Sequence, residues 1–203
     1  MGLTLPSSGR AKGRFAHFGP PFMSNIIGVT MHQSALSASL KAQLPSNRKL
    51  KGDMIMSTGT IRFHRVFRAN PERIYRAFLD ADAMAKWLPP YGFTCKVHHM
   101  DAKVAGTFKM SFQNFSTGQG HSFGGEYREL VPGELIRYTD KFDDPNLPGE
   151  MQVTVTLKQV SCGTEIHIVQ EGIPEVIPLE MCYLGWQESL TQLANLVEPD
   201  IPG

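Results

Sequence analysis

The chain has 203 residues, in which 20 Lys and Arg side chains nearly balance 19 Asp and Glu side chains, for a formal net charge of +1. The charge is unevenly spread, because residues 1–55 carry +6 and the remaining 148 residues carry −5. The larger part therefore lacks a strongly basic surface for phosphates, and we expect no nucleic-acid partner. No run approaches the roughly 18 apolar residues of a membrane-spanning helix, so we expect a soluble chain with no membrane partner.

The three cysteines, Cys95, Cys162 and Cys182, form neither a Cys-x-x-Cys motif nor the cysteine–histidine spacing of a zinc finger. An odd number without such motifs argues against a disulfide framework and against a structural zinc site. We therefore predict a reducing compartment, the cytoplasm, and expect neither a metal nor a cofactor.

Residues 1–55 are rich in Pro, Gly and Ser and poor in apolar side chains. Such a segment buries too little apolar surface to offset the entropy of ordering it, so we predict a disordered or weakly structured basic extension. Two alternatives stay open for it: an organelle transit peptide, and an over-called start with the natural chain beginning at Met56.

The folded part is predicted as one domain over residues 56–203, and its first elements are a strand and two short helices. Residues 61–67 alternate as a strand, with Arg65 on the same face as the apolar side chains. Asn70 as N-cap and Pro71 after it predict a first short helix. A second starts at Asp80 or Asp82, runs through Trp87 and ends at the two prolines that follow.

The rest of the chain is predicted as six strands and a long helix. Turn residues separate strands expected at Phe93–Met100, Gly106–Gln113, His121–Leu130, Glu134–Phe142, Met151–Val160 and Thr164–Glu171. Apolar side chains then recur at steps of four and three residues from Leu179 to Val197, which predicts one amphipathic helix. This order predicts an α+β fold in which the long helix packs on an antiparallel sheet of about seven strands.

The order of several short motifs resembles one protein family. The run Arg65–Tyr75 followed by Asp80–Trp87, then Asp101 with Gly106, Gly125-Glu126-Tyr127, Gly163-Thr164 and Gly185-Trp186, is similar to the activator-of-Hsp90-ATPase-homologue-like family. That family belongs to the START-like (SRPBCC) helix-grip superfamily, with Bet v 1 and the polyketide cyclases. Two departures are Asn70, where the family usually has Pro, and Leu88-Pro89, where it usually has Trp and Gly.

The resemblance implies a curved sheet that grips the terminal helix around a cavity for a small apolar or amphipathic molecule. Strand alternation independently points Phe63, Phe67, Phe108, Met110, Phe112, Val153, Val155, Ile166 and Ile168 toward the helix. Further candidates for the ligand-binding wall are Trp87, Tyr127, Tyr138, Met181 and Trp186. For any one of these large side chains, ordinary packed core is the default explanation.

Arg65 is the unusual residue on the inner face, because a buried guanidinium must be paired. It either anchors a ligand carboxylate or polar head, or forms an internal ion pair with Glu171 or Glu126, or reaches water at the strand end. Elsewhere, His99, Asp101 and Cys95 share one strand face but form too weak a cluster for a metal site. The glycine-rich segment 118–125 joins two strands, so we expect a hairpin at the cavity mouth rather than a phosphate loop.

These observations favour a ligand-binding protein with no assigned reaction and no catalytic residues. One alternative is a co-chaperone-like protein acting on Hsp90, although the separate amino-terminal domain of the family's co-chaperones has no counterpart here. Another alternative is an enzyme akin to the polyketide cyclases or aromatases, with Arg65, Tyr127, Tyr138 or His167 as polar groups in the cavity. A homodimer is an open expectation.

Overall fold

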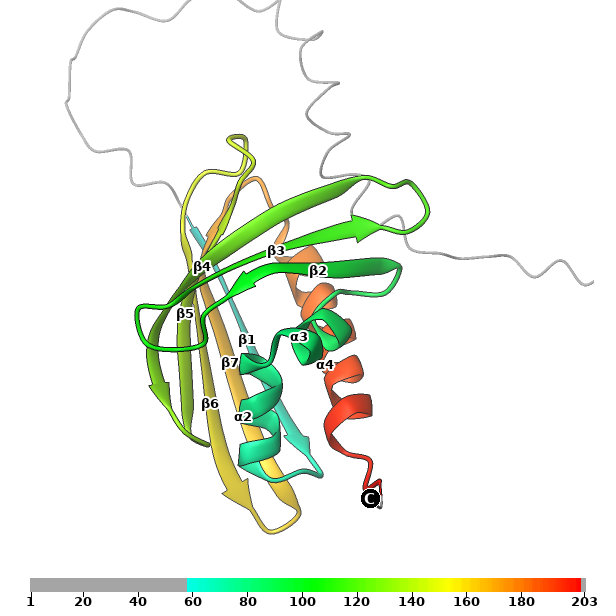
Figure 1. The fold of residues 1–203 in the computed structure, drawn as a ribbon. Coiled ribbons are helices and arrows are strands. Elements are labelled where there is room, and N and C mark those ends of the chain that lie inside the picture. The colour runs from blue at the N-terminus through cyan, green and yellow to red at the C-terminus, as the bar shows by residue number, and fades with distance from the viewer. Residues whose placement is uncertain (1–57, 202–203) are drawn as a thin grey trace, which may run out of the picture.

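A computed structural model describes residues 58–201, which form one curved antiparallel sheet with three helices on one side of it (Figure 1). The strands are β1 (Thr58–Phe67), β2 (Phe93–Met100), β3 (Thr107–Asn114), β4 (Gly120–Val131), β5 (Leu135–Phe142), β6 (Met151–Val160) and β7 (Gly163–Pro174). The helices are α2 (Pro71–Leu79), α3 (Ala81–Trp87) and α4 (Leu179–Val197). The predicted helix-grip fold is confirmed. Our expectation for residues 1–55 lies outside the described residues.

The sheet order is β1-β7-β6-β5-β4-β3-β2, and every neighbouring pair is antiparallel. Register shifts interrupt β1, β2 and β4, and such bulges increase the local bend and twist of a strand. The sheet therefore curves around the helices instead of lying flat against them.

The two short helices begin where their caps predict. The Asn70 side chain accepts a hydrogen bond from the Arg73 N–H at 2.8 Å, and Pro71 occupies the first turn of α2. The Asp80 side chain accepts one from the Ala83 N–H at 2.8 Å, which places the start of α3 at the earlier of the two predicted caps. Among residues 58–201, no helix is long and apolar enough to cross a bilayer.

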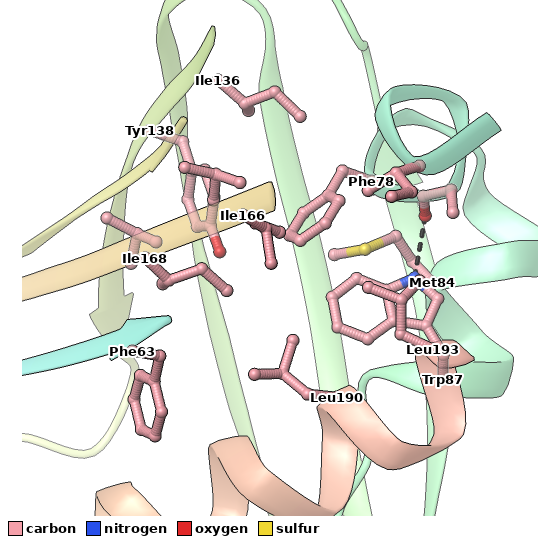
Figure 2. Close-up of a cluster of buried hydrophobic side chains, with 14 of the residues drawn as sticks. Phe63, Phe78, Met84, Trp87, Ile136, Tyr138, Ile166, Ile168, Leu190 and Leu193 are labelled. Atoms are coloured by element: carbon pink, nitrogen blue, oxygen red, sulfur yellow. Dashed lines mark hydrogen bonds between the residues drawn. The ribbon is translucent and has the colours of Figure 1, made fainter. Parts of the chain in front are cut away.

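The hydrophobic core lies where α2, α3 and the second half of α4 meet the sheet (Figure 2). Trp87 is fully buried, packs edge-on against Phe78 at 4.7 Å between ring centroids, and donates its indole N–H to the Ala77 carbonyl at 2.8 Å. Leu190 and Leu193 of α4 face the same cluster. This core fixes one end of the space between sheet and helix and leaves the other end for the site.

Candidate functional site

A cavity of about 800 Å³ lies between the sheet and the first half of α4. Its wall is mainly apolar and aromatic, with side chains from α3, from strands β2 to β7 and from α4. The aromatic and large aliphatic members are Met84, Leu88, Phe93, Phe108, Phe112, Phe123, Tyr138, Phe142, Leu147, Met151, Val153, Ile177, Met181 and Trp186. A volume of this size matches the usual range of roughly 300 to 1,000 Å³ for small-molecule sites.

The cavity occupies only one end of the inner sheet face. On β5, Ile136 packs in the core, whereas Tyr138 and Phe142 line the cavity. On β6, Met151 and Val153 line it, and Val155, further along the strand, is buried in the core. The same antiparallel strands therefore supply core at one end and cavity wall at the other.

The rim of the cavity is made of loops. The tip of the β3–β4 hairpin contributes Thr117 and Gln119, and residues 143–147 between β5 and β6 contribute the opposite side. Thr117, Gln119 and the neighbouring Val176 are exposed. The expected hairpin is present at the cavity, but its turn lies at residues 115–119, and the glycine-rich segment from Gly120 onward belongs to β4.

Among residues 58–201, Asp140 is the one Asp, Glu, Lys or Arg side chain that a strand contributes to the cavity wall. It lies on β5 between Tyr138 and Phe142 on the inward face, and it pairs with Met151 of β6. Its Oδ1 atom is buried, and no described residue gives that atom a hydrogen bond. Burial raises the pKa of the Asp140 carboxyl to about 7, a rise that the Lys141 backbone N–H partly opposes.

The cavity wall also contains two titratable aromatic side chains, Tyr138 and His121. Burial, followed by the nearby Asp140 and Tyr127, raises the pKa of Tyr138 well above its usual value. Burial lowers the pKa of His121, so its imidazole is neutral at pH 7. Burial also raises the pKa of the Cys182 thiol on α4 to about 11, which keeps it protonated and unreactive.

Gln170 of β7 organises the polar contacts on the side of α4. Its Oε1 accepts a hydrogen bond from the Trp186 indole N–H at 2.8 Å, and its amide N–H contacts the Met151 sulfur at 3.2 Å. These contacts hold the Trp186 ring against the cavity wall. The polar groups of Gln170 are therefore satisfied within the protein, in contrast to Asp140 Oδ1.

The structure places six of the fourteen sequence-predicted ligand-binding residues in the cavity wall: Phe108, Phe112, Tyr138, Val153, Met181 and Trp186. The other eight, Phe63, Arg65, Phe67, Trp87, Met110, Tyr127, Ile166 and Ile168, do not line it. All of these except Arg65 are buried in the core cluster. The alternation of side chains along the strands correctly predicted that the strand residues among them point inward. It did not predict which end of each strand faces the cavity.

Arg65 is half-buried and points along the inner face of β1 rather than into the cavity. Its guanidinium carbon lies 5.0 Å from the centroid of the Phe67 ring. No ion pair of Arg65 is present among the described residues, and Glu126 instead pairs with Arg128 at 2.7 Å. Of the three alternatives for Arg65, the internal ion pair is absent from residues 58–201, and the guanidinium instead makes a cation–π contact.

Sequence reasoning missed Asp140, His121 and Gln170, which all line the cavity. A signal for Asp140 was present, since alternation from Ile136 through Tyr138 puts it on the inward face of its strand. No comparable signal marks the loop 143–147, because its approach to the cavity depends on the tertiary fold.

A second group of polar side chains lies on the outer face of β1 and β7. His64 and His167 are cross-strand partners, and the His64 Nε2 atom lies 2.8 Å from the Glu165 carboxylate. The three ligand atoms lie within 4.8 Å of one another, so these residues could hold a divalent metal ion. The hydrogen bond from His64 lowers the pKa of Glu165. The histidines of β2 are engaged separately, His98 with Ser111 and His99 with Thr107.

Comparisons with known proteins agree with this fold. The chain is similar to protein CV1439 from Chromobacterium violaceum, whose crystal structure it matches with 66% identity and a TM-score of 0.69 over 70% of this chain and 98% of that chain. Proteins from Rhodobacter sphaeroides and Rhizobium leguminosarum are each 18% identical, with TM-scores of 0.61 and 0.60, and share the fold. Their matches cover 67% and 71% of this chain and 90% and 97% of theirs.

No curated protein matches the chain. The profile of the family described as activator of Hsp90 ATPase homolog 1-like protein matches residues 68–198, which is most of the folded part. This match confirms the resemblance carried by the sequence motifs. The chain therefore belongs to the activator of Hsp90 ATPase homolog 1-like family.

Proposed function

We propose that the chain binds a small apolar or amphipathic molecule in the cavity between the sheet and α4. The observation that carries this proposal is the cavity of about 800 Å³ with a mainly aromatic and aliphatic wall. Protein interiors pack as densely as organic crystals and leave few voids larger than a water molecule. A hollow of this size beside a well-packed core is therefore explained best by an occupant.

Gly185 provides a direct way to test this proposal, because it lies on the cavity face of α4. A Cβ atom added there meets no other atom within 4 Å, so a large side chain at this position has room to enter the cavity. We expect Gly185→Phe to fold normally and to lose binding of the neutral fluorescent probe N-phenyl-1-naphthylamine. The measurement is a fluorescence titration of the full chain with this probe.

The matched control is Gln187→Phe, which places the same side chain on the exposed face of α4. This variant should bind the probe as the unmodified chain does. Failure of the unmodified chain to bind the probe, or equal binding by the Gly185→Phe variant, would refute a ligand site in this cavity.

An acid–base enzyme of the polyketide cyclase kind is the second candidate. It is favoured by Tyr138 and Asp140, two titratable groups that share one inward strand face in the cavity wall, and by the pKa of about 7 at Asp140. Native mass spectrometry of protein from its own host would identify a co-purifying molecule. Recovery of that molecule unchanged after prolonged incubation with the protein would count against catalysis.

Hsp90 is a further candidate partner, supported by the family description alone. A pull-down that recovers Hsp90 in near-equal amount would favour it over a small-molecule role. The three cysteines are free, which supports the proposed cytoplasmic location. The homodimer stays a prediction.

A further inference from the structure

The charged side chains of the cavity wall are all acidic. Asp140, Asp143 and Asp144 line it, and no Lys or Arg among residues 58–201 does. His121 is the one imidazole that the described residues contribute to the wall, and burial lowers its pKa, so it is neutral at pH 7. A molecule inside the cavity therefore meets acidic side chains and no lysine or arginine of the wall itself.

The three carboxyl groups differ in how they are satisfied. Asp143 pairs with the Lys109 ammonium group, and Asp144 accepts hydrogen bonds at 2.8 Å from the backbone N–H and the side-chain amide of Asn146. Asp140 alone retains a buried oxygen with no partner in the described part of the chain. A buried polar atom without a partner costs free energy, so Asp140 is the position where a bound molecule gains most by supplying a donor.

This arrangement discriminates between polar head groups. A carboxylate or phosphate next to Asp140 would lose its hydration without gaining a cation as partner, and it would be repelled by the Asp140 carboxylate. Both effects disfavour its binding. A hydroxyl supplies a donor to the carboxyl, and an ammonium group supplies donors and an opposite charge. The neighbouring Tyr138 and Phe142 rings would surround either head group with apolar surface.

We infer that the occupant of the cavity is an amphipathic molecule whose polar end is a hydrogen-bond donor, an amine or a hydroxyl, received by Asp140, and that acids and phosphates of the same tail are rejected. This inference rests on the proposed function and adds the chemical class of the ligand. It also removes Arg65 from the role of carboxylate anchor, because Arg65 lies outside the cavity wall.

Three probes with one tail and different heads test the inference: decylamine, decan-1-ol and decanoate, each displacing N-phenyl-1-naphthylamine from the full chain at pH 8. We expect decylamine to displace the probe most strongly, decan-1-ol next and decanoate about tenfold more weakly than decan-1-ol or worse. The Asp140→Asn variant removes the charge and keeps an acceptor. It should bind decylamine about tenfold more weakly, leave decan-1-ol nearly unchanged and improve decanoate.

The Asp144→Asn variant is the matched control, since it removes a rim carboxylate and keeps the acceptor that caps its own loop. It should preserve the order of the three probes. If Asp144→Asn weakens decylamine as much as Asp140→Asn does, the selectivity comes from general negative charge at the rim and the role of Asp140 is refuted.

A pH series on the unmodified chain keeps the test independent of any variant. Lowering the pH from 8 to 6.5 converts most of Asp140 to its protonated form, so decylamine affinity should fall while decan-1-ol affinity holds. The other titratable groups that face Asp140 are Tyr138 on its own strand, His121 on β4, Cys182 on α4, and Asp143 and Asp144 in the loop. Tyr138 and Cys182 stay neutral over this range because burial raises their pKa values, and His121 stays mainly neutral because burial lowers its pKa below 6.5. The Asp144→Asn control reports on the loop.

The outcomes separate the two proposals. Equal displacement by all three probes, or tightest binding of decanoate, overturns the inference and leaves the ligand-binding function standing. Binding of neither the fluorescent probe nor any decyl compound overturns both. Selectivity for the amine and alcohol that disappears in Asp140→Asn alone supports both.

Discussion

Asp140 combines a buried carboxyl oxygen with a position in the wall of a cavity, so its protonation is coupled to folding as well as to binding. Burial disfavours the charged form, and the pKa in the folded chain rises from 3.8 to about 7. Between these two values the folded state holds a proton that the unfolded state has released. Stability therefore falls as pH rises through this window, which is opposite to the behaviour of a carboxylate held in an ion pair.

The Asp140→Asn variant should be more stable than the unmodified chain at pH 8 by about 2 to 4 kcal/mol, because it removes a buried charge. The advantage should shrink as the pH falls and be nearly gone at pH 4, where Asp140 is neutral in the folded chain and only partly ionised in the unfolded chain. Urea unfolding at pH 4, 6 and 8 measures it. A stability difference that is the same at all three pH values would contradict the coupling.

α4 shows how one helix serves two purposes along its length. The apolar spacing predicted a continuous buried stripe from Leu179 to Val197. In the structure Leu190, Leu193 and Val197 are buried, whereas Leu179 and Tyr183 are 39% and 41% exposed. Tyr183 stacks on Phe63 at 4.5 Å between ring centroids, beside the cavity. The side chains of this half that line the cavity are instead Met181, Cys182 and Trp186, whereas Leu179 and Tyr183 lie against β1 outside the cavity wall. Periodicity therefore identifies the inward side of a helix but not which of its residues are fully covered.

The two tryptophans of the chain offer a test of whether α4 has a half that packs in the core and a half that lines the cavity. Trp87→Phe should lower the free energy of unfolding by about 2 to 4 kcal/mol, because the fully buried Ala77 carbonyl contact is lost and a void is left between α2 and α3. Trp186→Phe, which removes a half-buried indole from the wall, should cost only about 1 kcal/mol.

Ligand binding should respond in the reverse order. Trp186→Phe should weaken N-phenyl-1-naphthylamine binding, and Trp87→Phe should leave it nearly unchanged at a denaturant concentration where both variants are folded. Urea unfolding and the probe titration give the two readings. Equal losses of stability in both variants would contradict the division of α4 into a packed half and a cavity half.

At the scale of the whole molecule, β4 and β5 approach each other so closely that one position of the sheet requires glycine. A Cβ atom on Gly125 would lie 1.7 Å from the Thr139 carbonyl oxygen, which belongs to the backbone of the neighbouring strand and cannot move aside alone. Gly118 in the β3–β4 hairpin is different, because its φ of +72° favours glycine but a Cβ there meets nothing within 4 Å.

Gly125→Ala should therefore destabilise the fold by about 3 kcal/mol, since the two strands must separate to admit one methyl group. Gly118→Ala should cost about 1 kcal/mol, from backbone conformation alone. Thermal unfolding of the two variants compares them directly. A similar loss of stability in both variants would show that glycine is needed at these positions only for its backbone conformation and not for the close approach of β4 and β5.

Most of the fold could be predicted from the sequence, because the spacing of apolar side chains and the residues that favour turns are local properties of the chain. The two helix caps and all seven strands follow from them. The ends of β1 and β7 extend past the predicted limits, since backbone pairing continues beyond the register shift between Gly59 and Thr60, where side-chain alternation no longer marks the strand. The candidate site was only partly predictable, because the border between packed core and cavity depends on where α3 and the loop 143–147 approach the sheet.

The two tryptophans also give the molecule a built-in optical reference. Trp87 is fully buried, bonded to a backbone carbonyl and not part of the cavity wall, so a molecule in the cavity does not touch its ring. The Trp186 indole forms part of the cavity wall, so its emission senses whatever molecule or solvent lies against it. The intrinsic fluorescence of the protein thus contains both a constant component and a component that reports cavity occupancy, without any attached label.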